Sequence, residues 1–269
     1  MTDRSRSLYT CVILVPRVIL IPRINLSLSK GRIAMTAALA ATVLSACAPR
    51  TEAAQPDRYV QLYRALHPTV VLLTMKIPSE DPKRKGQWDD AYGSGVVVAS
   101  DARGSRILTD AHVIADAKDL VAVVGDGPSA PATVVATTND LDDLAIVDIP
   151  LRNRPVATLG SAAHLEPGTA IGVLGYPIPD AFTDEKLGRT VSMYTGRIAS
   201  VRPGALELNL AIVPGESGGP VFDATSGEVI GIAESRFDEE RAIGFATPID
   251  VAKRFLAQHP RRGAVSATR

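Results

Sequence analysis

The sequence predicts an all-β domain built from barrels or sandwiches, and three observations support this. Short runs of Val, Ile and Leu recur along most of the chain, and Gly, Pro, Asn or Asp separates most of them, as is typical of β-barrels and β-sandwiches. A long helical pattern appears only near the C-terminus, at 248–259. Hydrophobic residues make up 46% of the 269 residues and aromatic residues 4%, so the core must consist mainly of Val, Ile, Leu and Ala.

The predicted elements follow one another in two halves that are separated at about 151–168. Residues 57–66 place four apolar or aromatic side chains at helical spacing, so we expect a short amphipathic helix that ends before Pro68. The first half is expected to hold strands at 69–75, 93–100, 106–110, 119–125, 132–138 and 144–149. The second half is expected to hold strands at 170–176, 190–201, 205–212, 220–223, 228–235 and 242–249. The charged segment 76–91 is predicted to be a surface loop.

The N-terminal segment has the pattern of an export signal. Basic residues precede an apolar run that begins at Ile33 and ends in small residues before Cys47. This run is shorter than the roughly 20 residues of a transmembrane helix. Residues 44–47, "LSAC", resemble the bacterial lipobox, in which the cysteine is lipidated; the alternative is a plain secretory signal cut nearby. We therefore expect 1–46 to be a targeting segment and 47–56 a flexible tether, in a protein exported to the bacterial cell envelope or periplasm and lipid-anchored through Cys47.

Charge and cysteine usage exclude several classes of function. Residues 1–46 hold six of the 29 Lys and Arg but one of the 29 Asp and Glu, which leaves 23 basic and 28 acidic residues in the rest. This acidic balance argues against nucleic-acid binding. The chain has only two cysteines, Cys11 and Cys47. Cleavage before Cys47 would remove Cys11 and lipidation would use Cys47, so no internal disulfide is expected. The Cys and His residues form no ligand-spaced cluster, so neither a metal nor an organic cofactor is implied.

The string "GESGGP" at 215–220 raises the question of a nucleophilic serine, Ser217. It satisfies G-x-S-x-G, the nucleophile elbow, but that motif needs a helix directly after the serine and a histidine downstream. Here strand, turn and strand patterns follow, and the one downstream histidine is His259 in a polar tail. The elbow is therefore excluded.

Two upstream strings support the other interpretation. "ILTDAHVI" places His112 at the end of a strand, and "DLAIVDI" begins with Asp143. The order His, Asp, Ser is that of the chymotrypsin-type triad. With these strings, "LYRALHPTVVLLT", "YGSGVVV", "LGSAAHLEPGTAIGVLGYP", "GEVIGI" and "IGFATP", the chain resembles the trypsin-like serine endopeptidases, closest to the bacterial HtrA/Deg type, over about 58–250.

That resemblance implies two six-stranded antiparallel β-barrels, at about 68–150 and 165–250, with a short helix at each end. The protease domain would span 57–259, followed by a disordered tail at 260–269. His112, Asp143 and Ser217 would form the triad, with the backbone N–H groups of Gly215 and Ser217 as the oxyanion hole. The substrate pocket would be lined by Ala211, Ile232, Ala233, Glu234 and Gly244. Ala211 stands where trypsin is acidic, so we expect a preference for small or medium aliphatic side chains.

Several alternatives remain open at this stage. Asp142 is adjacent to Asp143 and competes for its role, and the usual Asn or Asp before the serine is replaced by Glu216. A catalytically weak peptide-binding or chaperone-like module on the same fold is the competing function. Tyr59 and Tyr63 suit either core packing or a homotrimer contact of the HtrA kind. The expected partners are unfolded proteins or peptides, and no PDZ domain is expected within these 269 residues.

Overall fold

The computed structural model describes residues 57–138, 142–234 and 243–261. The predicted targeting segment, the tether and most of the tail lie outside these ranges. In the part of the chain that is described, no helix is both long enough and apolar enough to cross a membrane.

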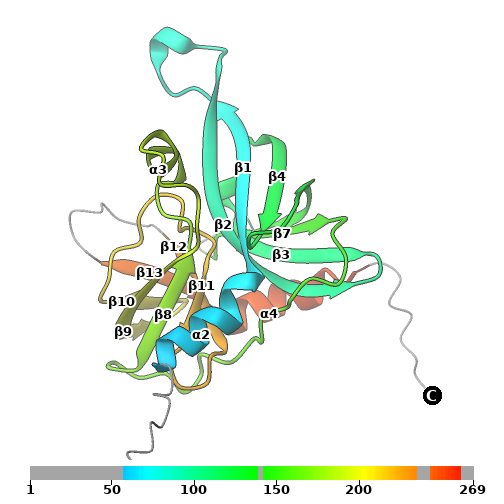
Figure 1. Ribbon diagram of the computed structural model, residues 1–269. Coiled ribbons are helices and arrows are strands. Elements are labelled where there is room, and N and C mark those ends of the chain that lie inside the picture. Colours follow the sequence, from blue (N-terminus) through cyan, green and yellow to red (C-terminus); the bar gives the residue numbers. More distant parts are fainter. Residues whose placement is uncertain (1–56, 139–141, 235–242, 262–269) are drawn as a thin grey trace, which may run out of the picture. The chain divides into compact units, whose positions relative to one another are not determined.

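The first half is an antiparallel sheet that curls around one apolar core (Figure 1). Helix α2 (Arg58–Leu66) precedes it, and Asp57 caps the start of this helix by accepting the Tyr59 N–H at 2.8 Å. The sheet has the strand order β5-β4-β1-β2-β3-β7-β6. Its strands are β1 (Val70–Pro78), β2 (Trp88–Asp101), β3 (Gly104–Asp110), β4 (Lys118–Val124), β5 (Ser129–Pro131), β6 (Thr133–Thr137) and β7 (Leu144–Ile149). Core side chains come from alternate positions of the strands, for example Val71 and Leu73 of β1.

The second half is a closed antiparallel barrel with the strand order β10-β13-β12-β11-β8-β9. Its strands are β8 (Ala170–Gly175), β9 (Ser192–Arg202), β10 (Ala205–Leu208), β11 (Pro220–Asp223), β12 (Val229–Glu234) and β13 (Gly244–Pro248). The short helix α3 (Pro179–Asp184) lies between β8 and β9, and α4 (Ile249–Gln258) follows the last strand. Each strand contributes apolar side chains to the barrel core, which includes Val173, Ile198 and Leu206.

The two halves pack against each other through two apolar clusters. In one, Val96, Leu108 and Ile146 of the first half meet Ile232 of β12 and Phe255 of α4. The other joins α2 and β1 to the second half and contains Leu62, Leu66, Val70, Leu174 and Phe222. Tyr59 and Tyr63 pack against this second cluster, and the Tyr63 hydroxyl donates to the Val191 carbonyl at 3.0 Å. Core packing therefore accounts for Tyr63.

The predicted all-β class, with a helix near each end, is confirmed. The first half has seven strands in place of six, because residues 129–131 pair with β4 as a separate strand. The loop prediction for 76–91 is wrong at both ends, since β1 and β2 stay paired as far as Pro78 and Trp88. In Figure 1, the segment 76–91 extends beyond the rest of the sheet. An ion pair of 2.7 Å joins Lys76 to Asp90, its direct cross-strand partner, so charge pairing supports strands where no apolar pattern predicted them.

Candidate active site

The sheet register places His112 beside Asp143. Strand β3 ends opposite the start of β7, with Asp110 paired to Leu144, so the residues just beyond each end meet. The Ala111 N–H donates to the Asp143 carbonyl at 3.0 Å and the His112 N–H to Asp143 Oδ1 at 2.9 Å. His112 Nδ1 lies 2.5 Å from Asp143 Oδ2. These contacts fix both the main chain and the ring of His112 relative to one carboxylate.

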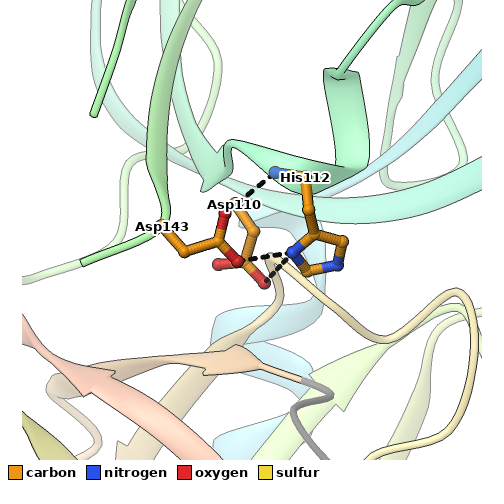
Figure 2. A group of neighbouring side chains, drawn as sticks. All are labelled: Asp110, His112 and Asp143. Carbon is orange, nitrogen blue, oxygen red and sulfur yellow. Dashed lines mark hydrogen bonds and ion pairs between the residues drawn. The ribbon is translucent and has the colours of Figure 1, made fainter. Parts of the chain in front are cut away.

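This contact decides which nitrogen of His112 is available for chemistry. A carboxylate accepts hydrogen bonds, so the proton of a neutral imidazole belongs on Nδ1 and the lone pair on Nε2. Figure 2 shows the second ring nitrogen pointing away from both carboxylates drawn. His112 can therefore accept a proton through Nε2 while Asp143 holds the opposite side of the ring. Asp142 makes a different contact: its carbonyl accepts the Thr247 hydroxyl at 3.0 Å.

A second carboxyl group, that of Asp110, lies close to the same ring. Asp110 is fully buried, and its Oδ2 is 4.0 Å from His112 Nδ1 (Figure 2). One atom of each of Asp110, His112 and Asp143 lies within 4.8 Å of the others, which is compact enough for a metal site. However, the 2.5 Å contact between His112 Nδ1 and Asp143 Oδ2 is a direct hydrogen bond and leaves no room for an ion between those atoms. In this arrangement, Asp143 orients the imidazole ring of His112.

Ser217 and His112 line the same cavity, which has a volume of about 660 Å³. Its walls come from β1 and β2, from the turn after β3, and from Pro214 and Gly215. Within the described residues no hydrogen bond joins Ser217 to His112, which is common for such pairs without a bound substrate. A larger cavity of about 1180 Å³ beside β6 and the end of α4 contains none of these residues. We place the candidate site in the smaller cavity because both His112 and Ser217 line it.

Ser94 anchors the loop that carries Ser217, and sequence reasoning did not identify it. It is fully buried, and its N–H donates to the Ser217 carbonyl at 2.9 Å. Its hydroxyl donates to the Gly215 carbonyl at 2.6 Å and accepts the Tyr176 N–H at 2.9 Å. The Thr109 hydroxyl donates to the Ser94 carbonyl at 2.6 Å. The polar residue between two glycines in "YGSGVVV" was the available signal, because a serine that precedes a buried apolar run needs polar partners when it is itself buried.

Ile178 holds the peptide that precedes Gly215. Its N–H donates to the Pro214 carbonyl at 2.8 Å. The C=O and N–H of a trans peptide point in opposite directions, so the Gly215 N–H is directed away from Ile178. Ile178 has φ 31° and ψ 56°, a left-handed conformation that is rare for a β-branched residue and further disfavoured before Pro179. Strained residues of this kind cluster at functional sites.

Gly215 occupies a position that only glycine suits. Its φ is +92°, and an added Cβ would lie 2.3 Å from the Tyr176 carbonyl oxygen. Among the described residues, the Gly215 and Ser217 N–H groups donate to no backbone carbonyl or side chain, which leaves both available to a ligand in the cavity.

Glu216 points into the protein rather than into solvent. Only 1% of the residue is exposed, and its Oε2 accepts the Val213 N–H at 2.9 Å. Burial raises the pKa of Glu216 to about 7, and the hydrogen bond from Val213 partly offsets that rise. The carboxyl group before the serine is thus accommodated inside the loop.

The five residues predicted to line the substrate pocket are not among those that line this cavity, and residues 235–242, which follow Glu234, lie outside the described ranges. Ile232 packs in the cluster between the two halves and Ala233 in the barrel core. Glu234 is buried at the end of β12. Ala211 is partly exposed, and Gly244 packs against Leu210 and Ile212, where an added Cβ would lie 2.8 Å from Ile212 Cγ1.

Comparisons of the sequence and of the fold with known proteins indicate the same family. The family model for the trypsin-like peptidase domain matches residues 93–232, just over half of the chain. The putative serine protease HhoB of Synechocystis sp. is 30% identical over 182 residues, which cover 65% of this chain and 41% of HhoB. A probable periplasmic serine endoprotease DegP-like of Pseudomonas putida (strain GB-1) is 30% identical over 194 residues, 70% of this chain and 38% of that protein. The chain thus spans about two fifths of the length of these relatives.

A solved structure, "HtrA-type protease AlgW with tripeptide", superposes with a TM-score of 0.60 at 28% identity, over 76% of this chain and 63% of that one. The sequence match and the superposition therefore support the same family assignment. The chain belongs to the trypsin-like peptidase family, and the relatives that it matches are HtrA/Deg-type serine proteases.

Proposed function

We propose that this protein is a serine endopeptidase that hydrolyses peptide bonds through Ser217, His112 and Asp143. The observation that carries this proposal is the pair of contacts from Asp143 to the main chain and ring of His112, on the cavity that Ser217 also lines. Family membership supports the same reaction class.

Each residue has a defined task in this reaction. His112 Nε2 takes the proton of the Ser217 hydroxyl as the oxygen attacks the carbonyl carbon, because a neutral hydroxyl is a poor nucleophile. Asp143 keeps the His112 proton on Nδ1 and stabilises the imidazolium that forms. His112 then returns the proton to the leaving amine, and water hydrolyses the acyl-enzyme by the same route.

The oxyanion of the tetrahedral intermediate would be bound by the Gly215 and Ser217 N–H groups. The contact from Ile178 to the Pro214 carbonyl and the Ser94 contacts to the Gly215 and Ser217 carbonyls support this role, because they engage these three carbonyls in hydrogen bonds and fix the orientation of their peptides. One such donor contributes about 3 to 4 kcal/mol to the transition state.

Substrates and location are proposed from the relatives. AlgW was solved with a tripeptide, and the DegP-like relative is described as periplasmic, so we propose peptides or unfolded proteins as substrates, in the cell envelope. Export would follow from the segment 1–46 and membrane attachment from lipidation of Cys47. A small or medium aliphatic residue before the cleaved bond is the proposed preference.

The test is cleavage of fluorescent casein by the full chain, with Ser217→Ala and His112→Ala as the decisive variants and Ser226→Ala as an exposed control. Loss of cleavage on the order of 10⁶-fold in the first two supports the triad. If the wild-type protein is folded and binds casein without cutting it, the protein is instead a peptide-binding module on this fold.

A further inference from the structure

The side chain of Glu216 closes the loop that carries Ser217 upon itself. Glu216 Oε2 accepts the Val213 N–H at 2.9 Å, and the Glu216 N–H donates to the Val213 carbonyl at 3.0 Å. The Glu216 carbonyl in turn accepts the Gly219 N–H at 2.9 Å. Through these bonds the position of one carboxyl group is linked to the main chain on both sides of Ser217.

The surroundings of this carboxyl group suit a neutral acid. Oε1 is shielded from solvent and has no hydrogen-bond partner among the described residues, and the ion pairs of those residues include none to Glu216. Gly175 of β8 packs against the main chain of Glu216 and against Ser94 of β2: an added Cβ at Gly175 would lie 3.1 Å from both Glu216 Cα and Ser94 Oγ. Tyr194 of β9 is a titratable residue that interacts electrostatically with Glu216. Burial raises the pKa of Tyr194, and the charge of Glu216 raises it further.

A charge in this place is costly. A buried carboxylate without a counter-ion loses far more hydration than one N–H group can replace. The burial that raises the pKa of Glu216 to about 7 reflects the same cost. To regain water, the carboxylate must leave the loop interior. It cannot do so without breaking its bond to Val213, which is one of the contacts that close the loop beside Ser217.

We propose that Glu216 is a positioning residue whose protonation state controls the serine loop: the neutral carboxyl holds residues 213–217 in the arrangement described, and the ionised carboxylate releases it. This inference rests on the proposed function for its effect on catalysis. The loop would be held where Glu216 is neutral and released as the pH rises and the carboxyl ionises. Activity would therefore fall at alkaline pH, and this falling limb would belong to Glu216.

The first part of the test is the rate at which a fluorophosphonate modifies Ser217 in the full chain between pH 5 and pH 9. Glu216→Gln keeps the shape and the acceptor for Val213 but cannot ionise, and Glu166→Gln is a control at an exposed acid. We expect the wild-type and Glu166→Gln rates to fall by about tenfold per pH unit at alkaline pH. The Glu216→Gln rate should stay level. Parallel profiles for wild type and Glu216→Gln overturn the inference.

The second part measures hydrogen exchange of a peptide covering 213–219 at the same pH values in Ser217→Ala, with and without Glu216→Gln. Comparison of the two proteins at equal pH cancels the intrinsic pH dependence of exchange. We expect faster exchange at high pH only where Glu216 is present. If Ser217 is unreactive at every pH but this difference appears, the proposed function fails and the loop control stands. If Ser217 reacts and no difference appears, the loop control fails and the proposed function stands.

Discussion

Glu216→Gln should remove a pH dependence from the folding stability of this protein. Burial raises the pKa of Glu216 from an ordinary value of 4.5 to about 7. The folded state therefore binds the proton more tightly than the unfolded state, so the contribution to stability is fully present below about pH 4.5 and is lost as the pH rises through about 7. A difference of about 2.5 pKa units at about 1.4 kcal/mol per unit corresponds to about 3.5 kcal/mol over the whole titration.

The assay is urea unfolding at pH 5 and pH 8 in a Ser217→Ala background, which prevents self-cleavage. With Glu216 present, the free energy of unfolding should fall by about 2.5 kcal/mol more between the two pH values than it does in the Glu216→Gln protein, whose amide stays neutral; the rest of the effect is already lost below pH 5. Glu166→Gln should leave the wild-type difference unchanged. If the Glu216→Gln protein loses as much stability as its parent over this range, the carboxyl is not the buried, unpaired acid that the structure describes.

Three further predictions concern the contacts around the site. Asp143→Asn should lower the rate of peptide cleavage by about 10⁴-fold through the wrong histidine tautomer, whereas Asp142→Asn should leave it within a fewfold, as measured by casein turnover. Ser94→Ala leaves the Gly215 carbonyl and the Tyr176 N–H without their partner and should cost about 1 to 3 kcal/mol in urea unfolding; an undiminished stability would show that these bonds are unimportant. Ile178→Gly should be more stable than Ile178→Ala by about 1 kcal/mol, because both remove the side chain and only glycine relieves the positive φ; the opposite order in thermal unfolding would contradict the strain.

Much of the fold could be predicted because its strands are apolar and separated by turn residues. Strands such as 144–149 have buried side chains at nearly every position, so a short apolar run marks them well. Strand β5 escapes prediction because it has only three residues and ends at Pro131. The paired ends of β1 and β2 escape it because the Lys76–Asp90 ion pair, rather than apolar alternation, accompanies them.

Some residues of the site can be predicted from a local motif, whereas others depend on contacts between distant parts of the chain. The geometry around His112 is consistent with a motif visible in the chain, and Asp143 rather than Asp142 contacts it. Ser94 depends on a partner 121 positions away along the chain, and Ile178 depends on Pro214 in a later loop. The local pattern around Ser94 indicates that it needs polar partners, but no local pattern identifies which distant residues these are. The sequence shows that Glu216 departs from the usual Asn or Asp before the serine. That its side chain faces the loop interior and not solvent is evident only in the folded structure.

The most direct test of the central claim is the site at which a fluorophosphonate reacts with the full-length protein near neutral pH. Digestion and mass spectrometry would locate the modified residue in wild type, His112→Ala and Ser217→Ala, with Ser226→Ala as the control serine. We predict modification of Ser217 in wild type and Ser226→Ala, and none at this position in His112→Ala. Reaction of Ser217 that is as fast without His112, or a folded protein in which Ser217 does not react, would contradict the proposed catalytic mechanism.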